Sequence, residues 1–333
     1  MHAQYNTTSV DSVDGDAVPG TEFVLRRARV TIDATFSDLL SARLEPDYGM
    51  APGAPAGTFT VRDAWVRLTF GPAVRATVGQ FKRPFDLFEI QPAAVNLVAE
   101  RMGLVRGIRA CGRLLGVCSL SSISRGLLYS NRDVGLMLDG TAIPQRLQYA
   151  VAFTNGQLAG IREPGDGKQV TGRIAVTALP GVVVGGNMTM KDYRHTDPAD
   201  SSAVTTRHAV GWGADVEIGR DDRGPHVMAG VIGGDNWREV VGPTDVASFL
   251  TAQVIATYRV PLKHRWITAI EPVGRASWAD PSQSADDNEG WLLTPGVIIH
   301  LDGRNRLHLN ADVWLPKAGN TEYGFISQLN VYF

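Results

Sequence analysis

The sequence contains no run of 18 or more apolar residues, which excludes a transmembrane helix. Neither sign of charge is in large excess, because 32 Lys and Arg residues stand against 34 Asp and Glu residues, and no nucleic-acid-binding signature is present. The first residues, MHAQYNTT, lack the basic and apolar segments of a signal peptide, so none is expected in this chain. These absences do not exclude a membrane β-barrel, whose alternating strands leave only a weak hydropathy signal.

Cysteine is scarce, with only Cys111 and Cys118 in the chain. Their spacing fits neither a zinc ribbon nor a redox CxxC pair, and two thiols cannot complete a zinc site unaided. In an oxidising compartment the two could form a disulfide that closes a loop, and the alternative is two separate buried thiols. No metal or other cofactor is expected.

Signals of catalysis are also missing. A hydrolase within a membrane barrel would need a Ser or Asp nucleophile beside a positioned histidine. No GxSxG-like elbow accompanies any histidine, so an enzyme is not expected. The histidines are His2, His195, His208, His226, His264, His300 and His308.

In the segment 321–333, TEYGFISQLNVYF, apolar and polar residues alternate. Aromatic and aliphatic residues from Tyr323 to Phe333 occupy one face at a period of two, and Glu322, Gln328 and Asn330 mark the other. Such a strand is typical of the closing strand of an outer-membrane barrel, with one face toward lipid and one toward a wet lumen. The alternative is the last strand of a soluble β-sandwich.

The same period of two recurs along the whole chain and indicates strands rather than helices. We expect sixteen strands, at 3–10, 22–36, 39–48, 58–70, 73–82, 131–139, 146–155, 168–178, 181–193, 205–219, 226–237, 246–260, 264–278, 290–301, 304–315 and 321–333.

The links between these segments alternate between short and long. Short links contain turn pairs such as Gly71-Pro72 and Asp302-Gly303, and the long links are polar and rich in Gly and Asp. This alternation predicts an all-β fold, a transmembrane antiparallel up-and-down β-barrel with short periplasmic turns and long outer loops. Residues 1–333 then form a single domain with both termini at the periplasmic end. Sixteen strands leave an aqueous channel, which predicts a pore.

Five of the tryptophans lie at the ends of the expected strands. This placement fits the aromatic girdles at the two membrane interfaces, although core packing is the alternative for each. The five are Trp237, Trp278, Trp291 and Trp314 at outer ends, and Trp266 at an inner end.

Five motifs follow one another along the chain: FVLRRARV at 23–30, VRDAWVR at 61–67, VGQFKRPF at 78–85, NRDVGL at 131–136 and EPVGR at 271–275. Their content and order resemble the phosphate-selective porin O and P family of Gram-negative outer membranes. The resemblance implies a homotrimeric sixteen-stranded porin in contact with the lipid bilayer and lipopolysaccharide. It also implies a loop that folds inward at the constriction, and a preference for anions of the phosphate class.

Anion selectivity requires Lys or Arg side chains at the narrowest section, where low-dielectric walls focus their field. On the lumen face of the expected strands, acidic and basic residues nearly balance, which favours cross-strand ion pairs; Glu271 and Arg275 are expected to form one. The link at about 83–130 is basic from Arg101 onward. Inside the barrel it would form a positive collar, whereas outside it would bind lipopolysaccharide phosphates or a neighbouring subunit. The candidates for anion contact are Lys82, Arg83, Arg101, Arg106, Arg109, Arg113, Arg125, Arg27, Arg29, Arg67 and Arg75.

The sequence thus predicts a passive, cofactor-free outer-membrane porin that prefers phosphate-like or polyphosphate-like anions. A weakly selective general porin is one alternative, because the wall charges nearly balance. A structural or adhesive barrel is another, because the link at 83–130 is long enough to plug the lumen.

Overall fold

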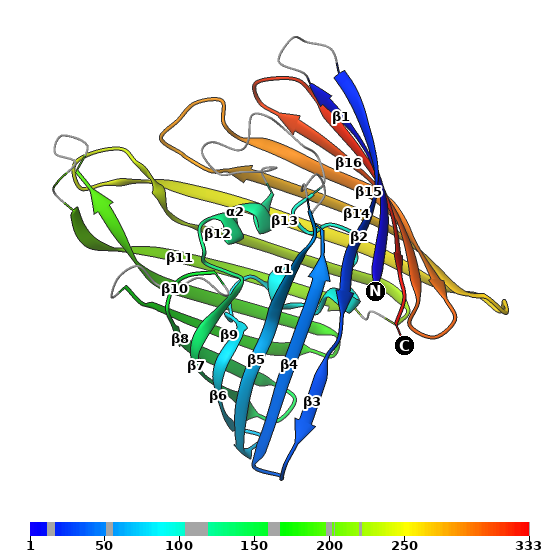
Figure 1. Cartoon of the computed structure of the whole chain (residues 1–333), viewed down its shortest axis with the longest axis horizontal. Coiled ribbons are helices and arrows are strands. Elements are labelled where there is room, and N and C mark those ends of the chain that lie inside the picture. Colours follow the sequence, from blue (N-terminus) through cyan, green and yellow to red (C-terminus); the bar gives the residue numbers. More distant parts are fainter. Residues whose placement is uncertain are drawn as a thin grey trace.

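The structure, a computed structural model, is a barrel formed by one antiparallel sheet whose ends meet (Figure 1). β1 (His2–Asp11) pairs with β2 (Ala17–Arg29) on one side and with β17 (Glu322–Asn330) on the other, which closes the ring. The structure describes residues 1–11, 17–50, 56–103, 119–158, 167–197, 202, 204–219 and 222–332.

The remaining elements follow in chain order around the ring. The next strands are β3 (Ile32–Thr35), β4 (Leu40–Gly49), β5 (Thr58–Gly71), β6 (Val74–Lys82), β7 (Arg132–Ile143), β8 (Leu147–Thr154), β9 (Gln169–Leu179) and β10 (Val182–Thr196). After them come β11 (Val204–Gly219), β12 (Gly224–Val240), β13 (Val246–Pro261), β14 (Ile267–Asp280), β15 (Gly290–Leu301) and β16 (Arg306–Pro316). Three short helices lie between β6 and β7, namely α1 (Leu87–Ile90), η1 (Ala93–Val95) and α2 (Leu120–Gly126).

The predicted sixteen-stranded barrel is confirmed. β2 and β3 both pair with β4, so they are two parts of one barrel strand that breaks after Arg29. Every expected strand overlaps an observed one, and neighbouring strands are antiparallel throughout. No helix in the described ranges is both long enough and apolar enough to cross a membrane.

Alternation places apolar side chains outside and polar ones inside. On the outer face Phe23 and Phe59 are 85% and 71% exposed, as a lipid-facing surface requires. The alternation of apolar and polar residues is interrupted at two β-bulges. One lies in β2 opposite His2, and the other lies in the pairing of β4 with β5, between Leu44 and Pro46. Pro46 has no backbone N–H for the ladder, which suits a bulge.

The short links and both chain ends lie at the same end of the barrel (Figure 1). Residues Met1 and Val331 exchange two backbone hydrogen bonds of 2.7 and 2.9 Å there. The turns at Gly181 and Gly303 have φ angles of 77° and 68°, which glycine adopts without strain.

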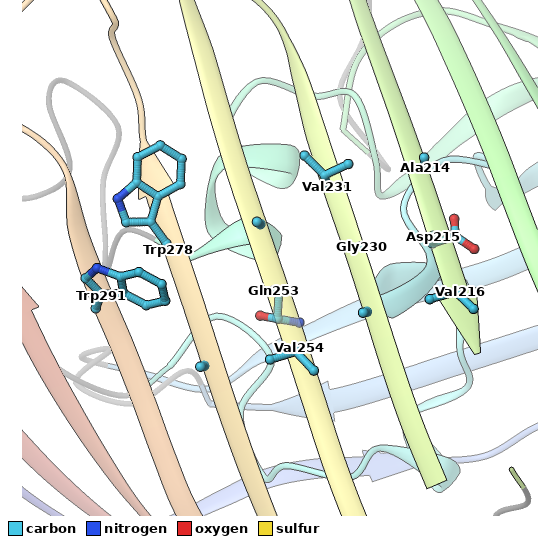
Figure 2. Close-up of a pocket in the computed structure, with 12 residues that line it drawn as sticks. Ala214, Asp215, Val216, Gly230, Val231, Gln253, Val254, Trp278 and Trp291 are labelled. Carbon is cyan, nitrogen blue, oxygen red and sulfur yellow. The ribbon is translucent and has the colours of Figure 1, made fainter. Parts of the chain in front are cut away.

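The aromatic girdle differs from the prediction in two of its five members. Trp278 and Trp291 pair across β14 and β15 on the outer face, beside a shallow apolar hollow of about 530 Å³ (Figure 2), and Trp266 is 59% exposed. Trp314, by contrast, is buried in an apolar core, and Trp237 packs against the same core. Both belong to the interior.

The link between β6 and β7, residues 83–131 and here called the inner loop, lies inside the barrel in its described parts (Figure 1). Helix α2 contacts β12, β13 and β14, and the amide of Leu120 donates to Ser277 Oγ at 3.0 Å. Loop side chains such as Phe85 and Ile123 form an apolar core with wall residues such as Phe249. This core fills the side of the lumen next to β10–β16.

Candidate functional site

The inner loop leaves an open cavity of about 500 Å³ on the opposite side of the lumen, here called the chamber. Loop residues Ile90, Pro92 and Ala93 form part of its lining, and β1, β2, β4, β5, β6 and β7 contribute the wall. Its charged side chains are six basic and two acidic ones, namely Arg27, Arg29, Arg43, Lys82, Arg132, Arg304, Glu45 and Asp63.

Several of these cations are ion-paired along the wall. Arg29 lies 3.1 Å from Glu45 and 2.8 Å from Asp47. Arg132 lies 2.6 Å from Asp63 and 3.4 Å from Glu45. These four carboxylate contacts link β2, β4, β5 and β7, so they brace the barrel as cross-strand pairs do.

Three cations of the chamber have no carboxylate partner among the described residues. Arg27 and Arg304 make no ion pair there. The ammonium of Lys82 donates to the carbonyls of Glu89 and Gln91, each at 2.7 Å. Since both acids of the chamber already pair with arginines, these three charges leave the chamber positive, and the low dielectric of the protein around it strengthens their field.

The inner loop is held to the wall by a buried arginine. The side chain of Arg275 is fully buried and donates to the carbonyls of Glu100 and Arg101 at 2.9 and 2.7 Å, and to Asp312 at 3.0 Å. From the other side, Arg26 pairs with the Glu100 carboxylate at 2.5 Å. These contacts fix one end of the described loop across the lumen.

The phosphate-selective porin O and P family matches residues 1–217. The chain belongs to this family. The barrel is also similar to the anion-selective porin from Comamonas acidovorans (12% identity, 98% of this chain, 96% of that chain, TM-score 0.63). Two further similar structures are the DcaP channel of Acinetobacter baumannii (12%, 98% and 94%, 0.61) and Salmonella typhi OmpF (10%, 98% and 96%, 0.60). No functionally curated protein matches the sequence.

Family and fold make this porin a channel of the Gram-negative outer membrane. The inner loop follows an inward path, as the resemblance implied, since its helix α2 contacts β12, β13 and β14. The segment 104–118, with Arg106, Arg109, Arg113 and both cysteines, lies outside the described residues.

The described loop arginines of the porin contact loop and wall groups. Arg83 is fully buried and bonds Asp133 and Gln169 at 2.9 Å each. Arg101 bonds Asn96 at 2.6 Å and lies 3.8 Å from Glu89. Arg125 lies 4.0 Å from Glu89 as well. All three hold the loop in place, and each lies within 4.0 Å of a carboxylate, although Arg101 and Arg125 share that of Glu89.

Two other predicted candidates lie toward the short-turn end of the wall. Arg67 donates to the hydroxyl of Thr77 at 2.9 Å, and Arg75 pairs with Asp139. The expected pair of Glu271 with Arg275 is wrong, because Glu271 pairs with His300 at 2.6 Å. The spacing of four residues places Glu271 and Arg275 on the same face of the strand. It does not reveal their closer partners, which are His300 on β15 and Asp312 on β16.

Three basic residues of the chamber were not among the candidates, namely Arg43, Arg132 and Arg304. Arg132 lies within the NRDVGL motif, directly before Asp133, and that position could have drawn attention to it. Arg304 lies in the turn that Asp302-Gly303 predicts. A turn residue reaches into the chamber only because the barrel closes, so its own sequence carries no such signal.

Asp86 in the inner loop gives the porin a pH-dependent stability. Burial, together with the nearby Glu89 carboxylate, raises the pKa of Asp86 to about 8 from 3.8, while the Phe88 amide, the Ser124 hydroxyl and Arg101 oppose the rise. Burial also works against the charge of Glu89, but Arg125, Arg101 and Lys82 outweigh it and lower the pKa of that carboxyl. Asp86 is therefore the member of the pair that is protonated at neutral pH.

Since the folded pKa exceeds the unfolded one, the stability contributed by neutral Asp86 is complete below 3.8 and is lost as the pH rises through about 8. We expect Asp86→Asn to flatten this decline, measured as the melting temperature in detergent from mildly acidic to mildly alkaline pH. Asp38→Asn, at an exposed turn position, is the control and should keep the wild-type slope. Equal slopes for all three proteins would contradict the assignment.

Proposed function

We propose that this porin is a passive channel with a preference for anions of the phosphate class. The observation that carries the proposal is the excess of cations in the chamber, with Arg27, Lys82 and Arg304 unmatched by any described carboxylate. The planar guanidinium of an arginine can offer two parallel hydrogen bonds to phosphate. Such contacts replace part of the hydration shell of the ion, and transport then follows the concentration gradient.

The proposal includes a homotrimer embedded in a bilayer that contains lipopolysaccharide, and it includes no catalytic activity. Support for the trimer comes from a similar barrel, OmpT of Vibrio cholerae (9% identity, TM-score 0.55), which is described in a trimer form. The support for a channel without catalysis is the family and the fold.

A weakly selective general porin is the second candidate, because Arg29 and Arg132 are ion-paired and leave only part of the wall charge free. A general porin would have the same open chamber, but the electrostatic field inside it would be weaker than in an anion-selective channel. A plugged barrel would have no conducting path.

The reversal potential of the purified porin in a planar bilayer under a KCl gradient tests these functions. We expect a chloride-favouring potential and a fall in current when phosphate is added, because phosphate would occupy the chamber. A potential near zero with large current steps and no phosphate block would favour the general porin. The absence of any conductance would contradict both and would favour the plugged barrel.

A further inference from the structure

An aromatic side chain faces the lumen beside the chamber. Trp65 on β5 pairs directly with Arg43 on β4, and Arg43 lines the chamber. Directly paired residues of neighbouring strands point to the same face, so the indole also points inward. Around it the wall positions of β5 and β6 are polar, as in Arg67 and Thr77. Trp65 is half-buried, so part of its ring is open to the lumen.

Two guanidinium groups lie over this indole. The central carbon of Arg67 is 4.6 Å from the ring centroid, and that of Arg43 is 5.5 Å away. Both distances are within the range of cation–π attraction. The two cations differ in their other partners: Arg43 pairs with Asp33 at 2.6 Å, whereas the hydrogen bond of Arg67 within the described chain goes to the neutral hydroxyl of Thr77. Among the described residues, the charge of Arg67 has no carboxylate to match it.

We propose that Trp65 and Arg67 form a binding site for aromatic carboxylates, which combine a planar ring with one negative charge. The carboxylate accepts hydrogen bonds from the guanidinium of Arg67, and the ring of the ligand packs against the open part of the indole. A ligand with both groups uses both features, whereas phosphate or acetate uses only the charge. This inference rests on the proposed anion preference and names a substrate class for it.

The test compares three monovalent carboxylates as blockers of the channel current in a planar bilayer. Benzoate has the planar ring, cyclohexanecarboxylate has a saturated ring of similar size, and acetate has no ring. We expect half-block at the lowest concentration for benzoate. In Trp65→Leu the concentration of benzoate for half-block should rise roughly twofold to tenfold, the effect of losing one aromatic pair. Acetate and phosphate should block the variant as they block the wild type.

Trp266 provides a matched control. Arg265 lies 4.6 Å over its ring, as Arg67 does over Trp65, but Trp266 is exposed in the link between β13 and β14. Trp266→Leu should therefore leave the three blocking concentrations unchanged. Trp65→Phe is the second variant, since it keeps a ring at the site and should retain the order of the three blockers.

The outcomes separate this inference from the proposed function. Equal block by benzoate and cyclohexanecarboxylate in a wild-type channel that still prefers chloride would overturn only the aromatic site. A loss of acetate and phosphate block in Trp65→Leu as large as the loss of benzoate block would also overturn it, because Trp65 would then act only by supporting the arginines. A wild-type channel with no anion preference would overturn the proposed function and this inference together.

Discussion

Replacing Arg275 by alanine is expected to raise the conductance of single channels severalfold while lowering the stability of the barrel. Its guanidinium is the buried donor that joins the inner loop to the wall, through the carbonyls of Glu100 and Arg101 and the carboxylate of Asp312. Without it the Asp312 side chain, which is fully buried, loses the ion pair with Arg275. Removing one partner of a buried ion pair costs about 3–5 kcal/mol.

Part of this cost is relieved if the inner loop leaves the wall, because water then reaches Asp312 and the two carbonyls. The loop is what narrows the lumen, so its release opens a wider path. Single-channel recordings measure the conductance, and the melting temperature in detergent reports the stability. Arg275→Lys should give a smaller change, since it keeps the charge but loses the guanidinium fork.

Arg173→Ala provides a matched control within the same wall. Arg173 forms a comparable ion pair with Asp215 at 2.5 Å, on β9 and β11, but it bonds no described residue of the inner loop. The variant should lose stability and keep the wild-type conductance. If Arg275→Ala also kept the wild-type conductance, the apolar core around Ile123 and Phe249, and not Arg275, would be what holds the loop in the lumen.

The double variant Arg27→Gln/Arg304→Gln is expected to remove most of the anion preference. Both cations line the chamber without an ion-pair partner in the described part of the chain, so their replacement removes charge without exposing a buried acid. A unit charge about 4 Å from an ion contributes about 1 kcal/mol even in bulk water. Removing two such charges costs a bound anion about 2 kcal/mol, so the anion-to-cation permeability ratio should fall by about thirtyfold or more at low ionic strength, and by less at high salt.

The control for this variant changes the same net charge elsewhere at the same end of the barrel. Lys263 and Arg265 are exposed in the link between β13 and β14 and do not line the chamber. Reversal potentials of Lys263→Gln/Arg265→Gln should stay close to the wild-type value. Similar shifts in both double variants would mean that the selectivity arises from overall charge and not from the chamber.

Much of the barrel was predictable from local pattern. Each strand has an apolar and a polar face, and this alternation appears in any stretch of about ten residues, as in β10 or β17. The break after Arg29 was not predicted, because the strand 22–36 keeps its alternation on both sides of it. The break lies opposite Pro46 of β4, which has no backbone N–H to donate to the ladder, so it depends on the neighbouring strand.

The alternation also indicated where Trp314 lies, whereas its position at a strand end was misleading. Trp314 has the phase of Asn310 and Asp312, which are polar and point inward. Its position near the outer end of a strand favoured the membrane girdle, but its phase directs it to the core under the inner loop. Phase decides the face of the sheet, so it was the stronger signal.

The sequence by itself determined the barrel, its sixteen strands and the end at which the short turns lie, because alternation and turn residues act between near neighbours in the chain. Only the tertiary structure decided which cations are free. Arg132 meets Glu45, Arg83 meets Asp133, and Arg275 meets Asp312 across strands distant in sequence. A shift of one residue in the register of any strand would exchange these partners. Charge in the chamber therefore depends on how the ring closes and where the inner loop lies within it.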